Sequence, residues 1–199
     1  VLPDVNVKEI APKLFGVCFH NNGQTCAALK RLYVHASQYE ELGQAMAELA
    51  KKVKVGDGME EGTELGPVQN LAQLKIVQDL AESARTDGGR FLAGGKRMDR
   101  AGYFFEPTIV ADLSDGSRLV DEEPFGPILP IIKYTDIDEV IERANRNESG
   151  LGGSIWSSDT RKAAELAQRL ECGSAWVNDH GAIQPDAPFG GVKQSGMGV

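Results

Sequence analysis

Apolar residues recur at steps of three or four in four segments of the chain, which is the period of an amphipathic helix. The first segment opens with Ser37 and Glu40 at the spacing of a capping box. The third follows Asp136, or Thr135 as an alternative cap, and the fourth follows Asp159. The pattern predicts helices over residues 37–53, 71–84, 136–147 and 159–170.

Short runs rich in β-branched and aromatic residues alternate with these helices, which is typical of strands. Alternation of this kind predicts an α/β fold with a largely parallel, twisted sheet flanked by helices on both faces and ligands near the carboxyl ends of its strands. No repeat or low-complexity linker divides the chain, so residues 1–199 are expected to form one domain. The predicted strands are RLYVH (31–35), PTIVADL (107–113), ILPIIKY (128–134), GSIWSS (153–158) and SAWVND (174–179).

Composition narrows the class of protein. The 199 residues are 41% hydrophobic and 25% charged, as in an ordinary soluble protein, and no apolar run approaches the ~20 residues of a membrane span. The net charge of -8 is spread along the chain without a basic face, so neither nucleic acid nor membrane is an expected partner. The first residues have neither the charged nor the apolar region of a secretory signal, which favours the cytoplasm.

The three cysteines, at positions 18, 26 and 172, form no C-x-x-C pair, which argues against a disulfide framework and a zinc knuckle. Cys26 follows the turn-forming residues of NNGQT, and this context predicts an exposed thiol that can act as a nucleophile. Backbone N–H groups at such a turn can also donate to a developing oxyanion. The alternatives are a buried spectator thiol and a metal site formed by Cys18, His20 and Cys26.

Two further segments place chemically useful groups on loops. In LVDEEPFGPILP, Glu123 precedes Pro124 and Phe125 follows it, so that a carboxylate suited to ribose hydroxyls and an aromatic ring suited to a planar ligand share one loop. A solvated acidic turn is the alternative. In APFGGVKQSGMG, Gly190 and Gly191 allow close backbone approach. Neither this segment nor GLGGS at residues 150–154 has the glycine spacing of a dinucleotide phosphate loop.

Taken together, NNGQTC, EEPFGP and PFGGVKQSG resemble the catalytic domain of the aldehyde dehydrogenase superfamily, in the family's order and spacing over essentially the whole chain. The first resembles the family's nucleophile segment, the second its cofactor-contact loop and the third its signature near the C-terminus. The resemblance implies an NAD- or NADP-dependent enzyme that oxidises an aldehyde to a carboxylic acid.

The resemblance implies that Cys26 is the catalytic thiol, which forms a thiohemiacetal with the aldehyde, loses hydride to the cofactor and is freed by hydrolysis of a thioester. Glu123 matches the carboxylate on the nicotinamide ribose, and Phe125 matches the aromatic residue beside the nicotinamide. Gln73 matches a position that often contacts the adenosine-side ribose, although Ile76 replaces the basic residue often found three places later.

The substrate side follows from the same resemblance. Asn178 is expected to begin the loop that closes a substrate tunnel, and His20 replaces a common aromatic residue, which indicates a more polar tunnel mouth. We interpret His35 and His180 as structural histidines. The residues expected to line the tunnel are His20, Thr25, Ile183 and Phe189.

The chain also departs from the family pattern. The family's general-base glutamate lies in a Glu-Leu-Gly-Gly segment before the nucleophile, whereas Glu41 follows Cys26 within a predicted helix. We therefore expect a fragment that lacks the nucleotide-binding domain before Val1 and the oligomerisation strand after Val199. The fragment alone is expected to be inactive. The full-length protein is expected to be a homodimer or homotetramer. The alternative is a non-catalytic binding or structural module that retains the fold. The aldehyde, the choice between NAD and NADP, and the fragment's own oligomeric state stay open.

Overall fold

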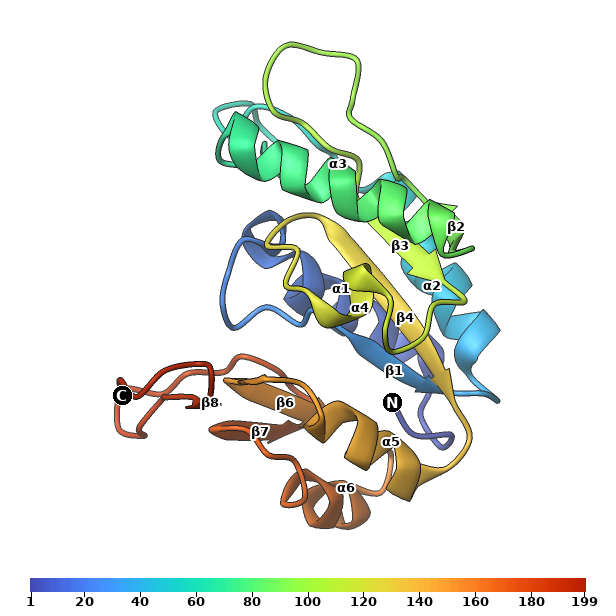
Figure 1. Ribbon diagram of the computed structural model, residues 1–199, viewed down its shortest axis with the longest axis vertical. Coiled ribbons are helices and arrows are strands. Elements are labelled where there is room, and N and C mark those ends of the chain that lie inside the picture. Colours follow the sequence, from blue (N-terminus) through green and yellow to red (C-terminus); the bar gives the residue numbers. More distant parts are fainter.

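The computed structural model describes residues 1–199 and contains a four-stranded sheet with helices on both sides (Figure 1). Strands β1, β4 and β3 are parallel, and β2 joins the edge antiparallel to β3. The sheet is mostly parallel and flanked by helices, so the predicted α/β fold class is confirmed. In spatial order the strands are β1 (Leu32–His35), β4 (Ile128–Tyr134), β3 (Thr108–Ala111) and β2 (Arg90–Ala93).

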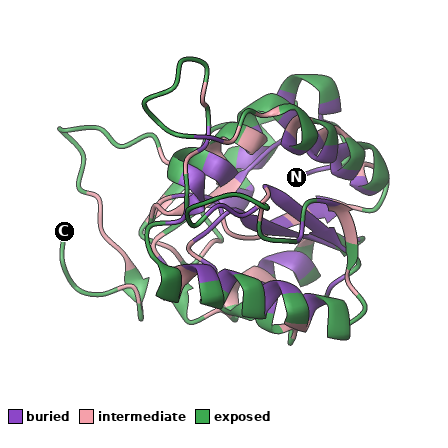
Figure 2. Ribbon diagram, turned by 90° about the horizontal axis from the view of Figure 1, so that it is seen from above, coloured by how far each residue is buried: buried purple, intermediate pink, exposed green.

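The alternation of side chains along the strands divides the core into two layers. Helices α1 (Val7–Phe19) and α2 (Tyr39–Lys52) pack against one face of the sheet. Helix α3 (Leu71–Thr86) and the short α4 (Arg118–Asp121) pack against the other. Figure 2 shows the buried strands between these helices. The first layer receives Ile109, Ala111, Leu129 and Ile131, and the second receives Val110, Ile128 and Ile132.

A smaller unit follows the four-stranded sheet. It contains a parallel pair of strands and two helices, with a separate antiparallel pair formed by β5 (Ser149–Gly150) and β8 (Val192–Lys193). The unit has its own apolar cluster around Ile155 and Leu166. Its main elements are α5 (Ile137–Asn145), β6 (Gly152–Ile155), α6 (Thr160–Ala167) and β7 (Ser174–Val177).

The first two residues connect this unit to the sheet. The Val1 amine donates a hydrogen bond of 2.7 Å to the carbonyl oxygen of Tyr33 in β1, and the His35 N–H donates to the Val1 carbonyl at 3.1 Å. The N–H of Leu2 donates to the carbonyl of Trp156, just after β6, at 2.9 Å. Main-chain hydrogen bonds therefore run from β1 through residues 1–2 to the end of β6.

All four predicted helices are confirmed, as α2, α3, α5 and α6, and Asp136 and Asp159 cap the last two. The predicted capping box is wrong. Helix α2 begins at Tyr39 without a side-chain cap, because the Ser37 hydroxyl instead lies 2.8 Å from Nδ1 of His35.

All five predicted strands are present, but several elements arise outside the predicted pattern, and two of them are α1 and β2. Helix α1 is capped by Asn6, whose side chain accepts from the Lys8 N–H at 3.2 Å and donates to Glu9 at 2.7 Å, although Pro12 lies inside the helix. Strand β2 is the second. None of the helices combines the length and apolar character that crossing a membrane requires.

Candidate functional site

Cys26 lies in the turn between α1 and β1. The turn starts with the 3₁₀ segment η1 (His20–Gly23), in which Asn21 and Asn22 have positive φ values of 49° and 62°. These residues end α1, because asparagine tolerates the left-handed backbone better than most residues do. The Cys26 thiol is exposed, as predicted, while Cys18 is buried and Cys172 is half-buried.

The main chain around the sulfur leaves hydrogen-bond donors free. The N–H of Ala28 donates to the carbonyl of Thr25 at 3.0 Å, which closes the turn. The N–H groups of Cys26 and Ala27 donate no hydrogen bond within the chain. They are therefore available to an oxygen atom bound beside the sulfur.

The loop before β4 packs directly against this turn. Gly23 has a φ of 71°, and a side chain there would collide with the carbonyl oxygen of Gly126. Gly126 in turn lies against Val77 of α3. The turn before Cys26 and the loop with Glu123 and Phe125 therefore meet main chain to main chain, which only glycine permits.

Gln73 joins the same cluster from the first turn of α3. Its side-chain amide donates to the carbonyl of Pro124 at 2.8 Å, and its backbone N–H donates to the helix cap Asn70 at 2.8 Å. The structure thus brings Gln73, Glu123 and Phe125, the three residues predicted to contact the cofactor, to the turn that carries Cys26.

Lys30 is a member of this site that the sequence analysis missed. Its ammonium group lies 3.3 Å from Oε1 of Glu123 and 5.2 Å from the centre of the Phe125 ring. It also donates to the carbonyl oxygens of Thr25 and Ala28, the second at 3.3 Å. Burial lowers the pKa of Lys30, and the charge of Glu123 opposes that effect.

The position of the cluster differs from the expected one. Cys26 precedes β1, and the loop with Glu123 and Phe125 precedes β4. Because β1 and β4 are parallel, these residues gather at the amino ends of the strands. The expectation of a site at the carboxyl ends is therefore wrong for them. The loops that enter the strands bear these candidate side chains.

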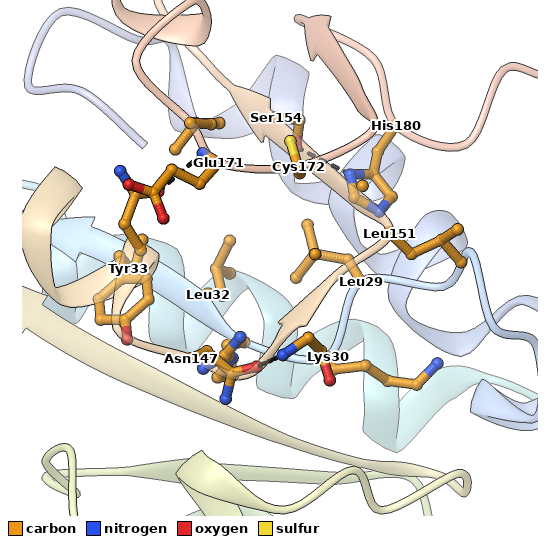
Figure 3. Close-up of a pocket in the computed structure, with 18 of the residues that line it drawn as sticks. Leu29, Lys30, Leu32, Tyr33, Asn147, Leu151, Ser154, Glu171, Cys172 and His180 are labelled. Atoms are coloured by element: carbon orange, nitrogen blue, oxygen red, sulfur yellow. Dashed lines mark hydrogen bonds between the residues drawn. The ribbon is translucent and has the colours of Figure 1, made fainter. Parts of the chain in front are cut away.

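A cavity of about 410 Å³ opens beside the cluster, between β1 and β6 (Figure 3). Residues 29–33 form one wall and residues 149–156 the other, with Cys26, Glu123 and Phe189 also in its lining. These walls are largely strand edges, whose main-chain groups suit an extended backbone better than a small aldehyde. We therefore do not equate this cavity with the predicted substrate tunnel.

His180 is buried in the lining of this cavity. Its Nδ1 lies 3.0 Å from the Ser154 hydroxyl (Figure 3). Its ring centre lies 5.0 Å from that of Trp176. Burial, with a smaller contribution from the charge of Lys30, lowers the pKa of His180 to about 4. The ring is therefore neutral at pH 7, in keeping with a structural histidine. His35, at the end of β1, contacts Ser37 and Tyr134.

Of the residues predicted for the substrate tunnel, Phe189 lines this cavity and the others do not. Phe189 lines the cavity with Cys26, at 6.4 Å from the ring of Trp176. The side chain of Asn178 instead bonds both main-chain groups of Ser157, at 2.9 and 2.8 Å. Their roles stay predictions. The predicted tunnel residues outside the cavity lining are His20, which is exposed, Thr25, which is half-buried, and Ile183, whose exposed fraction is 55%.

The groups beside Cys26 fit a nicotinamide nucleotide. The Glu123 side chain is 52% exposed, and its Oε2 has no partner within the chain, so the carboxylate can accept hydrogen bonds from ribose hydroxyls. Phe125, held at a φ of 43°, offers an aromatic face at the same loop. Cys18, His20 and Cys26 do not form a cluster with the geometry of a metal site.

Comparison with known proteins identifies the family. The model of the aldehyde dehydrogenase family matches residues 1–199. The chain belongs to this family. It spans about 40% of the length of the relatives that it matches. The activity of a longer enzyme is therefore a matter for proposal.

Among these relatives is an aldehyde dehydrogenase of Enchytraeus buchholzi, 39% identical over 198 residues, which are all of this chain and 40% of the relative. A phenylacetaldehyde dehydrogenase of Pseudomonas fluorescens is 39% identical over 200 residues, with the same coverage. Among solved structures, the NAD⁺ complex of a Bacillus cereus aldehyde dehydrogenase superimposes with a TM-score of 0.95 at 36% identity, over 99% of this chain and 40% of that one.

Proposed function

We propose that this chain is the catalytic domain of a cytoplasmic, homo-oligomeric aldehyde dehydrogenase that oxidises an aldehyde to a carboxylic acid with NAD or NADP. The observation that carries this proposal is the exposed Cys26 in a turn with two free N–H groups, packed against the loop of Glu123 and Phe125. A nucleophile, an oxyanion site and a nucleotide-binding loop are the parts that such a reaction requires.

The reaction begins when the Cys26 sulfur, as thiolate, adds to the aldehyde carbon and forms a C–S bond. The carbonyl π electrons move to the oxygen, and the N–H of Cys26 stabilises the resulting oxyanion of the thiohemiacetal. Loss of hydride from this carbon leaves a thioester on Cys26. Water then attacks the thioester carbon, and the carboxylic acid leaves as the C–S bond breaks and the thiolate returns.

The cofactor, when bound, supplies the chemistry of hydride acceptance. Glu123 would hold the nicotinamide ribose through its free oxygen, and Phe125 would pack beside the nicotinamide ring. Gln73 would act from behind the loop through its hydrogen bond to Pro124. These contacts orient the ring toward the sulfur, which matters because a misplacement of about 1 Å can cost on the order of a hundredfold in rate.

The base that activates water is proposed to lie outside these 199 residues. Glu41 is on α2, a helix that packs on α1 and on strands β2 and β3. The chain alone is therefore expected to fold with a modifiable Cys26 but to lack turnover, since loss of a positioned base costs ~10²–10⁴-fold.

The test is production of NADH or NADPH by a longer protein that contains this chain, with short, aromatic and semialdehyde substrates. Cys26→Ala should abolish turnover and preserve the circular dichroism spectrum, whereas the matched control Cys172→Ser should retain turnover. A folded Cys26→Ala enzyme with substantial turnover would refute the assignment. Absence of activity in the parent protein on every substrate and both cofactors would instead favour a non-catalytic module.

A further inference from the structure

We propose that Lys30 is a positioning residue that joins the turn of Cys26 to the loop of Glu123 and Phe125, and holds a positive charge against the carbonyls that flank Cys26. This inference rests on the proposed function, because it assigns Lys30 a part in the same site. It begins from the fact that one ammonium group contacts both segments.

The hydrogen bonds of Lys30 enclose the nucleophile. The carbonyl of Thr25 immediately precedes Cys26 in the chain, and the carbonyl of Ala28 follows it by two residues. An ammonium group has three N–H donors and no acceptor. Two carbonyls and the Glu123 carboxylate therefore occupy all three donors and hold the nitrogen on both sides of the turn.

Burial makes these contacts specific. The Lys30 side chain is only 16% exposed, while its partner Glu123 is 52% exposed. A partly desolvated cation interacts more strongly with nearby charges than a cation in water does. The face of the Phe125 ring, 5.2 Å away, provides a further favourable contact for a cation. The Lys30 nitrogen therefore contacts Phe125, Glu123 and the turn of Cys26 at the same time and holds them in fixed positions relative to one another.

The sulfur is among the groups that act on this charge. The ammonium is held against the carbonyls of Thr25 and Ala28, on either side of Cys26 in the chain, so its positive charge attracts an anion that attacks from this turn. Glu123 partly neutralises the same ammonium. Lys30 therefore favours the nucleophilic form of the sulfur, and Glu123 moderates that effect. The titratable groups that act on Lys30 are Glu123, Cys26 and Cys18, and the charge of Lys30 in turn acts on His180.

The two partners should have opposite effects on the sulfur. Lys30→Met removes the charge and should slow carbamidomethylation of Cys26 by iodoacetamide at pH 7 by about three- to tenfold. Lys30→Arg keeps the charge and should stay within about threefold of the parent. Glu123→Gln leaves the ammonium without its counter-charge and should speed the reaction by about twofold. A merely structural contact would change the rate in the same direction for Lys30→Met and Glu123→Gln.

The rates are measured on the 199-residue chain, from pH 6 to 10, by mass spectrometry of the Cys26 peptide. Lys96→Met is the matched control, because Lys96 is an exposed lysine whose nearest carboxylate is Glu106, at 4.0 Å. A Lys30→Met rate within twofold of the parent would overturn the proposal, as would slowing by Glu123→Gln. If Lys30→Met does not fold, the alkylation rates of Lys30→Arg and Glu123→Gln still test the proposal. Alkylation needs neither cofactor nor turnover, so its outcome is separate from that of the dehydrogenase assay.

Discussion

The side-chain amide of Gln73 donates a 2.8 Å hydrogen bond to the carbonyl oxygen of Pro124, between the two residues proposed to hold the cofactor. The first turn of α3 thereby supports the loop of Glu123 and Phe125 from behind. One N–H of the Gln73 amide is used for this hydrogen bond, so part of its contribution to cofactor binding is expected to be support of that loop.

Gln73→Ala should lower the free energy of unfolding by about 1 kcal/mol, the usual contribution of one hydrogen bond. In the longer protein it should also raise the KM for the cofactor more than it lowers kcat, because the loop loses its support. Gln78→Ala, an exposed position on the same helix, is the control. Urea unfolding and initial-rate kinetics measure the two effects, and equal KM values for both variants would contradict this role.

Cys26 should be the preferred site of alkylation among the three thiols. Cys18 is only 4% exposed and burial raises the pKa of its thiol, and burial also raises the pKa of Cys172, which donates to the Ser174 carbonyl at 3.1 Å. We expect Cys26 to react at least about tenfold faster than either at pH 7.5. Time-resolved peptide mapping with iodoacetamide gives the three rates, and equal rates would mean that the turn does not present the sulfur.

Glu123→Gln in the longer protein should slow hydride transfer more than formation of the thiohemiacetal. The substitution keeps the size of the side chain and removes the charge that would accept from the ribose hydroxyls, so the nicotinamide loses its alignment. A loss on the order of a hundredfold follows for a misplacement of about 1 Å. Single-turnover absorbance at 340 nm measures the step, and an unchanged rate would remove Glu123 from the cofactor site.

The stability of a chain with a free amine at Val1 should rise with pH between about 5 and 8. Burial lowers the pKa of that amine to about 5, whereas in the unfolded chain it is ~8. Between these values the unfolded state binds a proton that the folded state does not, so stability falls as pH decreases through this window. The full loss is about 4 kcal/mol.

Urea unfolding at pH 5.5, 7 and 8.5 measures this dependence. Acetylation of Val1 removes the amine and should flatten the profile. His180, whose pKa is also lowered, keeps its own smaller dependence in both samples. Identical profiles with and without the acetyl group would show that the amine reaches water in the folded chain.

The sequence pattern alone was sufficient to predict the helices and strands that have a clear apolar period or a capping residue. Helices α3, α5 and α6 and strand β4 follow from apolar periodicity and caps. Helix α1 was missed although Asn6 and Glu9 have capping spacing, because Pro12 interrupts the pattern. Ser37 shows the opposite error, a predicted cap that does not form. Its hydroxyl interacts with the neighbouring His35 and does not cap the helix.

The candidate site depended on relationships that no local pattern contains. The resemblance supplied Cys26 and Glu123, but a lone lysine four residues after the cysteine has no motif of its own, so Lys30 was not identified. One signal was present in the sequence, because Lys30 follows the apolar run Ala27 to Leu29, where a solvated lysine is less expected. Its role emerged only when the fold brought Glu123, 93 residues away in the chain, to 3.3 Å.

The contact between Gly23 and Gly126 sets a limit on how this protein can change. No side chain lies between these two main chains, so no rotamer is available to absorb a shift of either one. A displacement of the loop of Glu123 and Phe125 is therefore expected to move the turn of Cys26 with it. We therefore expect the spacing from the Cys26 turn to this loop to stay nearly constant when other parts of the protein change.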